Sequence, residues 1–520
     1  MVGFKKGWLL GTLLTVCPLA VSVSCDRMSP EGPAPASEGV LVKPSYNRND
    51  VLKNPMTGWV MYGSATGSPS YWDTKFYNEE LGKDVYVKDY ASACYIRTGW
   101  CYFEPEDGVY AWRDPNSSLG KMIKGALDRG LPVAFRIVVD GRDQRRNTPK
   151  FVTDAGAKYW QSDPNHPEWV TPYPQDPVFQ RYYERLISEL AKDFDDPDKC
   201  AFVDAYGLGK WGEGHNVCYE YGNPVNERTE TLKYEVMDWI TDVYSRNFRN
   251  VPLLINYHRV IGHPTSDGAV NPNTEKLLNL CIGKGYSLRQ DAFGMTDYYK
   301  SWEKGYVANW FYKRPCVMEG GWIVSSHRYW TDGSGKYREG HPEDVRQGEY
   351  EDSKGSKVNM MDFRVGEETK SWFNDAFDLV RKFVSEGGYR LYPDQITVIE
   401  EIANGQTFTL AHRWRNMGWG YFPNNIPQWN YRYKVAFALL DSKDAVRQLV
   451  VDPEVEPSEW VEGAVNMYKT DFKVDVPPGN YTWAVAIVNT AKNNVPGIKL
   501  AVKGDFSKDG WYKIKDVTVK

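Results

Sequence analysis

The apolar runs VAFRIVV (133–139) and PLLIN (252–256) decide the fold class that this sequence predicts. Both are continuous rather than alternating, which is typical of strands buried on both faces, as in parallel sheets. They lie within the strand candidates Pro132–Asp140 and Pro252–Tyr257. Six further candidates are Gly58–Tyr62, Ala93–Gly99, Ala201–Gly207, Ser287–Gly294, Pro315–Glu319 and Tyr389–Tyr392.

Amphipathic segments lie between these runs, and their apolar residues recur at intervals of three and four. The segments are 118–130, 182–194, 232–248, 275–285 and 372–388. This spacing predicts helices that cover a sheet with one face. Eight strand candidates alternating with helices predict a (β/α)8 barrel, an α/β fold of about 340 residues here. An open doubly wound sheet is the competing fold, but the sequence lacks the glycine-rich phosphate turn that often marks one.

The pattern changes after about residue 393 to two-residue alternation, in runs such as QTFTLAHRW (406–414) and YTWAVAIVN (481–489). Turn residues separate these runs, for example at Pro477–Asn480 and Asp509-Gly510. Short alternating runs between turns predict an all-β sandwich.

The N-terminal segment has the features of an export signal. Lys5 and Lys6 precede an apolar run from Trp8 to Val23 that is short and interrupted for a membrane-spanning helix. The following Ser22-Val23-Ser24-Cys25 resembles a bacterial lipobox, which implies lipidation of Cys25 and attachment to the cell envelope. A plain secretory signal is the alternative. We divide the chain into a signal segment (1–24), a tether (25–45), a barrel (46–392) and a sandwich (393–520).

The amino-acid composition limits the classes of ligand that we expect this chain to bind. The net charge is -5, so there is no basic footprint for nucleic acid. Aromatic residues make up 14% of the chain, with 20 Trp and 35 Tyr, which fits either β-sandwich cores or platforms for sugar rings. The 8 cysteines form no CxxC pair, so we expect no cysteine-bound metal. The sequence does not decide whether Cys94 or Cys101 forms a disulfide with another cysteine.

Polar residues that follow the strand candidates are expected to line one rim, because function in such barrels lies at the carboxyl ends of the strands. We predict that ten of them bind substrate: Arg97, Trp100, Asp140, Trp211, His215, Asn256, His258, Asp291, Tyr298 and Trp322. Among these, Asp140 and Asp291 fit salt bridges equally well.

Two glutamates on this rim are the candidate catalytic residues. Glu213 lies in a glycine-flanked turn after the fourth strand, and Glu319 ends the seventh. Glycoside cleavage uses two such carboxyl groups, one to protonate the leaving oxygen and one to attack the sugar or activate water. Burial beside Trp211 is expected to keep a proton on Glu213. We expect Arg97 to orient Glu319 through a bidentate pair.

These acids resemble those of the retaining glycosidase clan of (β/α)8 barrels, which includes β-galactosidases and cellulases. The segment from Trp100 to Trp112 also fits the pattern W-x-x-x-E-P-x-x-G-x-Y-x-W of that clan. WGEGH with a C-terminal sandwich resembles bacterial exported barrel proteins of unassigned function. The resemblance implies Glu213 as acid/base and Glu319 as nucleophile. The clan usually has Asn where this chain has Gly212. Glu104 we interpret as part of a structural turn.

We therefore expect a retaining glycosidase with a carbohydrate substrate and with neither cofactor nor metal. An inactive cell-surface glycan-binding protein is the alternative, which the missing Asn supports. A third hypothesis is a metal-assisted hydrolase that uses His215 and His258 with Asp204 or Asp291. The sequence leaves the sugar, the linkage and the oligomeric state open.

Overall fold

The structure is a computed structural model, and residues 39–520 form one compact unit in it. The described residues are 39–63, 72–141, 145–161, 163–220, 227–261, 270, 273–296, 298–322, 324 and 334–520. The signal segment and Cys25 lie outside them, so the predictions of export and lipidation stay predictions. Among the described helices, none is long and apolar enough to cross a membrane.

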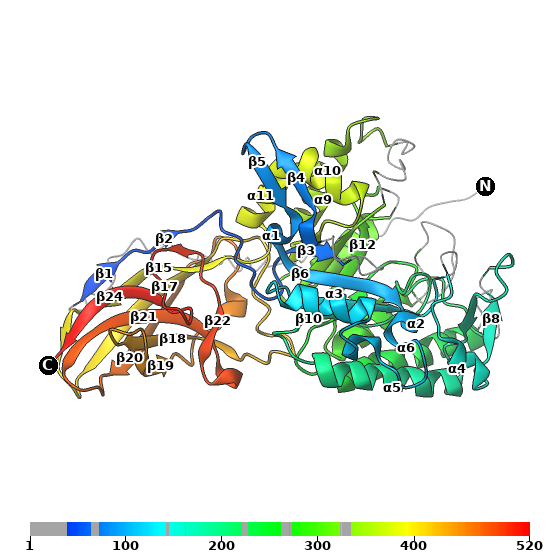
Figure 1. The fold of residues 1–520 in the computed structure, drawn as a ribbon. Helices are drawn as coiled ribbons and strands as arrows, with labels where there is room; N and C mark the ends of the chain where they lie inside the picture. Colours follow the sequence, from blue (N-terminus) through cyan, green and yellow to red (C-terminus); the bar gives the residue numbers. More distant parts are fainter. Residues whose placement is uncertain are drawn as a thin grey trace, which may run out of the picture. The chain divides into compact units, whose positions relative to one another are not determined.

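Eight parallel strands close into a barrel, as the sequence predicts (Figure 1). Each strand pairs with the next in the chain, and the last pairs with the first. The strands are β3 (Gly58–Tyr62), β6 (Ala91–Gly99), β7 (Val133–Val138), β10 (Cys200–Asp204), β11 (Leu253–Asn256), β12 (Ser287–Phe293), β13 (Cys316–Gly320) and β14 (Met360–Asp362).

Strand β7 shows why its apolar run is continuous, because its two faces pack into two different hydrophobic clusters. Phe135 and Ile137 belong to the hydrophobic cluster that the strands share with the helices. Ala134 belongs to a second cluster, which also contains Leu254 of β11. Because side chains alternate across a strand, Arg136 shares the face of Ala134 and lies among the inward-facing residues.

The outer layer consists of helices, which Figure 1 shows around the barrel strands. The longer ones are α3 (Ser118–Leu127), α5 (Pro177–Phe194), α6 (Glu227–Asn247), α7 (Thr274–Gly283), α8 (Ser301–Ala308), α9 (Pro342–Gly355), α10 (Glu367–Asn374) and α11 (Phe377–Glu386). Helix α5 illustrates their sequence determinants. It starts at Pro177, the Asp176 carboxylate caps the amides of Val178 and Phe179, and every third or fourth side chain is buried. Three short helices are α1 (Val87–Tyr90), α2 (Trp100–Phe103) and α4 (Lys150–Asp154).

The C-terminal part is built from two larger sheets. One has the order β1-β15-β17-β20, and the other has the order β16-β24-β21-β18-β19 with β22 on β21. Their strands are β1 (Val40–Val42), β15 (Leu391–Val398), β16 (Glu401–Ile402), β17 (Thr407–Asn416), β18 (Tyr433–Leu440), β19 (Val446–Val451), β20 (Asn466–Lys473), β21 (Gly479–Asn489), β22 (Val495–Ile498) and β24 (Tyr512–Val519). Minor two-stranded sheets pair β2 (Ser45–Tyr46) with β23 (Val502–Lys503), β4 (Lys75–Asn78) with β5 (Lys83–Tyr86), and β8 (Tyr159–Gln161) with β9 (Val170–Pro172). The barrel followed by mainly antiparallel sheets confirms the predicted fold class.

Two expectations about the elements are wrong. The eighth barrel strand is β14 at 360–362 and not the run at 389–392, where β15 begins and pairs with β1 and β17. Only three residues of β14 pair in the barrel, so its apolar run is too short to stand out in the sequence. Val40–Val42 lies within the predicted tether but pairs with Ile396–Val398, because VLV is an apolar strand-forming run.

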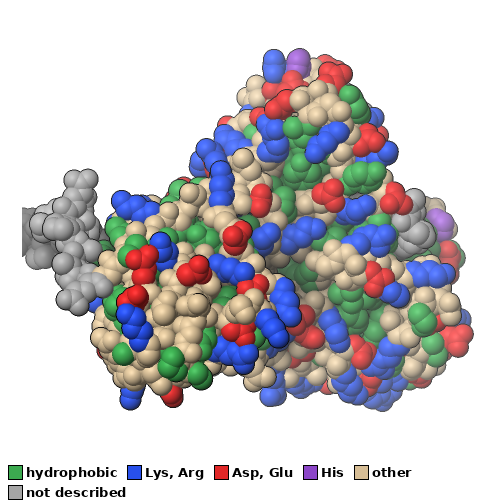
Figure 2. Space-filling view, turned by 60° about the vertical axis from the view of Figure 1, so that its left-hand side comes forward, with side chains coloured by type: hydrophobic (Ala, Val, Ile, Leu, Met, Phe, Trp, Pro, Cys, Tyr) green, Lys and Arg blue, Asp and Glu red, His purple; other side chains and the backbone are tan. Residues whose placement is uncertain are grey.

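The described cysteines are free thiols, and charged side chains of both signs are mixed on the surface in view (Figure 2). All six described cysteines are free, so no disulfide forms from Cys94 or Cys101 among the described residues. Burial raises the pKa of the Cys94 thiol to about 12, which keeps it protonated. Figure 2 shows acidic and basic side chains interspersed over the face in view, with hydrophobic side chains between them.

Candidate active site

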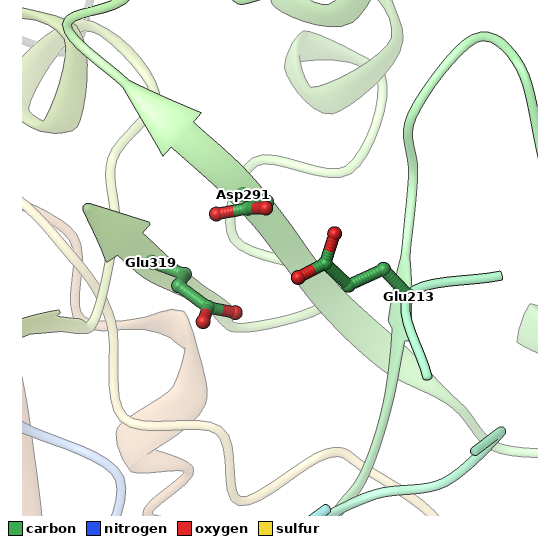
Figure 3. A group of neighbouring side chains, drawn as sticks. All are labelled: Glu213, Asp291 and Glu319. Atoms are coloured by element: carbon green, nitrogen blue, oxygen red, sulfur yellow. The ribbon is translucent and has the colours of Figure 1, made fainter. Parts of the chain in front are cut away.

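Three carboxyl groups converge at the carboxyl ends of neighbouring barrel elements. Glu319 lies on β13, Asp291 on β12, and Glu213 in the loop after β10 (Figure 3). Each residue has one carboxylate oxygen that lies within 4.8 Å of one carboxylate oxygen of each of the other two residues. The side chains in Figure 3 point toward a common space between them. The sequence paired Glu213 with Glu319, and the structure adds Asp291 to this pair.

The glycine-rich loop that carries Glu213 is shaped by its backbone. Gly209 has φ +77, and a Cβ there would lie 2.4 Å from the His215 carbonyl oxygen. Gly212 has φ +76, a left-handed conformation that glycine adopts without steric cost. The Asn256 amide also donates to the Glu213 carbonyl at 3.0 Å and so ties the loop to β11.

Glu319 is a fully buried carboxylate held by several donors. Tyr62 donates to its Oε1 at 2.5 Å, and Arg364 contacts the same oxygen. Arg136 and Arg289 contact Oε2 at 2.7 and 2.8 Å. Burial raises the pKa of Glu319, but the charges of these arginines lower it much more, to well below its usual range. Glu319 is therefore an ionised, fixed carboxylate, which suits a nucleophile.

Glu213 is also held in the ionised form. Its Oε1 lies 3.2 Å from Arg136 and 3.4 Å from Arg97, and its Oε2 lies 3.1 Å from Nε2 of His215. Burial raises the pKa of Glu213, but the hydrogen bond with His215 and the two arginines lower it to about 2. The expectation that burial beside Trp211 keeps a proton on Glu213 is therefore wrong. Arg97 pairs with Glu213, so the expected bidentate pair of Arg97 with Glu319 is wrong. Glu319 is instead contacted by Arg136, Arg289 and Arg364.

Asp291 has the opposite protonation tendency. Burial, followed by the charges of Glu213 and Glu319, holds the pKa of the Asp291 carboxyl well above its usual range. Two neighbouring acids with lowered pKa values and a third with a raised one form an acid/base arrangement. Of these three carboxyl groups, Asp291 is therefore the one whose pKa is shifted toward the protonated form.

Three arginines that sequence reasoning missed organise the site. They are Arg136 on β7, Arg289 on β12 and Arg364 after β14, and all three are buried. Arg136 also contacts Asp204 at 2.6 Å, and Arg289 contacts Asp204 at 3.0 Å. A charged residue inside an otherwise apolar strand run was the available signal for Arg136, because such a residue must find a buried partner. Arg289 lies in a strand with other polar residues, SLRQDAF, and had no such signal.

The histidines lie beside Glu213 but do not gather ligands for a metal. The rings of His215 and His258 are 5.9 Å apart, and Tyr298 lies 5.5 Å from His258. His258 accepts a hydrogen bond from the Val260 amide at Nδ1, and burial lowers its pKa to about 3, so it is neutral. Among the described residues, the group close enough to share an ion is the carboxyl trio, without a histidine. Arginines already contact Glu213 and Glu319, and their positive charges disfavour a metal cation at the trio.

The remaining residues that we predicted to bind substrate differ in how exposed their side chains are. Trp322 is 45% exposed, and the Arg364 guanidinium lies over its ring at 5.1 Å. Trp211 is half-buried, with the Lys210 ammonium 4.0 Å from its ring centre. Asp140 is buried and accepts a hydrogen bond from Thr171 at 3.3 Å.

Trp100 is a core residue, so its predicted role in substrate binding is wrong. Its ring packs against Phe151, Phe179 and Tyr183 in the layer between strands and helices. Its indole N–H donates to Glu104 at 3.0 Å. Glu104 is buried in this turn, as the sequence predicts for a structural residue.

Comparison with known proteins gives similarity only at the level of solved structures. No protein-family model and no curated protein matches the chain. One similar structure is the catalytic domain of a β-amylase from Paenibacillus polymyxa, which is 9% identical in sequence and has a TM-score of 0.37. The match covers 56% of this chain and 90% of the β-amylase chain. An endo-1,4-β-xylanase from Caldicellulosiruptor owensensis has 10% identity, with 61% and 88% covered and a TM-score of 0.36. Endoglycoceramidase II from Rhodococcus sp. has 10% identity, with 83% and 100% covered and a TM-score of 0.32.

These neighbours are glycoside hydrolases, but the identities and TM-scores are low. The barrel assignment therefore rests on the strand pairing of this chain, and the chemistry rests on its own side chains. The site combines fixed, ionised Glu319 with two further carboxyl groups, an exposed tryptophan and neutral polar groups at the carboxyl ends of the strands.

Proposed function

We propose that the protein is a glycoside hydrolase that cleaves an oligo- or polysaccharide with retention of configuration, using Glu319 as nucleophile. The observation that carries this proposal is the close approach of Glu319 and Glu213 at the carboxyl end of the barrel. Their chosen carboxylate oxygens lie within 4.8 Å of each other. Carboxyl groups are about 5–5.5 Å apart in retaining enzymes and about 6.5–9.5 Å apart in inverting ones. A close pair of carboxyl groups is what a two-carboxylate mechanism needs, and retention is the outcome that we propose for it.

In this mechanism Glu319 attacks the anomeric carbon while the glycosidic oxygen takes a proton from the acid side of the site. Both oxygens of Glu319 are engaged by Tyr62 and arginines, so its orientation is fixed before substrate binds. Glu213 and Asp291 lie on the acid side, and the sequence predicts Glu213 for the acid role. Water then releases the sugar from Glu319.

Neutral and aromatic groups support a carbohydrate as substrate. Trp322 is 45% exposed, and a partly exposed indole ring suits stacking on a sugar ring. Asn256 Oδ1 and His258 Nε2 are buried and have no hydrogen-bond partner among the described residues. An acceptor and a neutral donor suit a sugar hydroxyl, which can donate to one and accept from the other.

Substrate screening with two active-site variants tests the proposal. The wild type, Glu319→Gln and Glu213→Gln are assayed on a panel of aryl glycosides and polysaccharides, with product anomers followed by NMR. We expect the wild type to hydrolyse at least one substrate with retention. Both variants should lose turnover by about 100-fold or more, because each removes a charged group from the reacting centre.

Glu106→Gln is the matched control, because Glu106 is an exposed acid in the turn after α2. It should keep wild-type activity, and circular dichroism should show that all variants stay folded. Wild-type activity in Glu319→Gln would remove that residue from the mechanism. Saturable glycan binding without any product would favour the alternative of a glycan-binding protein.

A further inference from the structure

The connection between β7 and α5 is a long loop at the carboxyl end of the barrel. It runs from residue 139 to 176 and contains α4 and the hairpin of β8 and β9. Such connections are usually about 2–6 residues long, and much longer ones are commonly functional. Because the loop follows a barrel strand, it lies at the same end of the barrel as Glu213 and Glu319.

Two sets of contacts hold this hairpin against the loop that follows β10. The Thr171 hydroxyl on β9 donates to the Asp140 carboxylate at 3.3 Å, and the Asp140 carbonyl accepts from the Trp211 amide at 2.8 Å. The Lys158 ammonium, directly before β8, lies 2.6 Å from the Glu220 carboxylate. The hairpin is therefore fixed beside the loop after β10, which also carries the acid side of the site.

The strand register places a tryptophan on the face of the hairpin that meets this loop. Trp160 on β8 pairs with Thr171 on β9, and paired residues of antiparallel strands have their side chains on the same face. Thr171 contacts Asp140, so Trp160 lies on the side of the hairpin next to the Glu213 loop. Its side chain is half-buried, which leaves part of the indole accessible. Tyr159, the preceding residue, lies on the opposite face and is 51% exposed.

We propose that Trp160 and Trp211 form a binding site for sugars of the leaving group. The inference rests on the proposed glycosidase function and names its substrate class. Trp211 is half-buried and lies two residues before Glu213, on the acid side of the site. The acid side faces the glycosidic oxygen, so these rings meet the leaving group and not the sugar that bonds to Glu319. An indole face suits the apolar face of a sugar ring.

The order of the contacts defines how far the substrate extends. Trp211 and Asp140 lie between Glu213 and the hairpin face that carries Trp160. A small aglycone beside Glu213 does not span this distance, whereas a chain of sugars does. The substrate is therefore an oligo- or polysaccharide with several sugar units on the leaving-group side of the cleaved bond.

Chain-length dependence tests this site. Wild type, Trp160→Ala and Tyr159→Ala are assayed on the nitrophenyl monosaccharide, and on the disaccharide to the hexasaccharide, of the sugar that the panel identifies. We expect Trp160→Ala to lose about 10-fold in kcat/KM on the longer chains, the size of one aromatic contact, and to match wild type on the nitrophenyl glycoside. Tyr159→Ala changes the opposite face of the same strand and should match wild type on every substrate.

The position of the cut separates this site from a general structural effect. In water labelled with a heavy oxygen isotope, the label enters the fragment that was bonded to Glu319, so mass spectrometry shows which bond was cut. Wild type should prefer leaving groups longer than one sugar, and Trp160→Ala should shift the cut toward shorter ones. An unchanged cleavage pattern in Trp160→Ala, or an equal shift in Tyr159→Ala, overturns the proposal.

Binding without turnover keeps this proposal distinct from the proposed function. In a Glu319→Gln background, calorimetric titration with the oligosaccharides of the panel should show about 10-fold weaker binding for Trp160→Ala and no change for Tyr159→Ala. If wild type cleaves nothing but this difference is found, the glycosidase proposal fails and the aromatic site stands. If wild type cleaves oligosaccharides and Trp160→Ala binds and cleaves them equally well, the aromatic site fails alone. No binding of any oligosaccharide contradicts both.

Discussion

The hydroxyl of Tyr62 and three guanidinium groups fix the charge of Glu319 at the residue scale. The tyrosine lies at the end of β3 and donates to Glu319 Oε1 at 2.5 Å. Hydrogen bonds to a charged group contribute about 1.5–3 kcal/mol. The arginines and this hydroxyl act together, because a single buried carboxylate would otherwise take up a proton.

Tyr62→Phe removes this donor without changing the ring. We expect kcat/KM to fall by about 10- to 100-fold, which corresponds to the loss of one charge-assisted hydrogen bond. The donor favours ionised Glu319, so its loss raises the pKa of Glu319. The acidic limb of the pH–rate profile should therefore move to higher pH.

Tyr183→Phe provides the control, because Tyr183 on α5 also has a buried hydroxyl, which bonds to Tyr244 instead of Glu319. It should leave both kcat/KM and the acidic limb unchanged. An acidic limb in Tyr62→Phe that coincides with the wild-type limb would contradict the proposed hold on Glu319.

The sequence predicted site residues that follow the end of an apolar strand run. It did not predict site residues that lie in the middle of such a run. Glu213 and Glu319 follow apolar runs, so their convergence could be expected. Arg136 lies in the middle of VAFRIVV, and which buried acid it meets depends on strands far along the chain. The pKa of Glu213 depends on such contacts and could not be read from Trp211, its neighbour in sequence.

At the element scale, helices α9 and α10 are joined by a buried cluster of polar side chains around Arg346. Arg346 on α9 contacts Glu349 on the same helix and Glu368 on α10, and its Nε donates to Ser371 at 2.6 Å. Burial raises the pKa of Glu349 to about 8. The folded chain therefore keeps a proton on Glu349 at a pH where the unfolded chain has lost it.

This difference predicts how stability changes with pH. Glu349 is protonated in both states below its unfolded pKa of about 4.3, and stability is lost as pH rises from there toward 8. Glu349→Gln should remove that loss, so the variant should gain stability relative to wild type between pH 5 and pH 8, by roughly 3–5 kcal/mol. Thermal melts at both pH values measure it.

Glu351→Gln on the same helix is the control, because Glu351 is exposed. Its melting temperature should follow that of the wild type at both pH values. A Glu349→Gln variant whose difference from wild type is the same at pH 5 and pH 8 would contradict a neutral Glu349.

Elements were predictable when their apolar pattern was long. Seven barrel strands and helices α3, α5, α6 and α7 lie where the runs predict them. The predicted helix at 372–388 is instead divided between α10 and α11, and α8 and α9 were not predicted. The eighth strand, β14, is only Met360–Asp362, and its pairing with β3 and β13 closes the barrel. A three-residue strand has too little pattern to be distinguished from a loop, whereas the run at 389–392 has more and belongs to another sheet.

At the scale of the whole molecule, the barrel and the sandwich share their core. Trp419 lies in the sequence of the sandwich but belongs to the hydrophobic cluster of the barrel and its helices. Its indole N–H donates to the Val358 carbonyl at 2.8 Å. Asn359 beside β14 donates to the carbonyls of Met56 and Tyr421. The parts should therefore unfold together.

Trp419→Ala tests this cooperation. Removing a fully buried tryptophan should cost about 3–5 kcal/mol of unfolding free energy. Calorimetry should show one transition for the wild type and one transition at a lower temperature for the variant. Two transitions, only one of which shifts, would show that the barrel and the sandwich unfold independently.

The central claim is that Glu319 forms a covalent bond to the substrate. The most direct measurement is peptide mass mapping after incubation with a panel of dinitrophenyl 2-deoxy-2-fluoroglycosides, which form the glycosyl-enzyme quickly and release it slowly. We predict one added fluorosugar per chain, on the peptide that contains Glu319, and none in Glu319→Gln. A label on another residue, or inverted products from a substrate that the enzyme cleaves, would contradict the account.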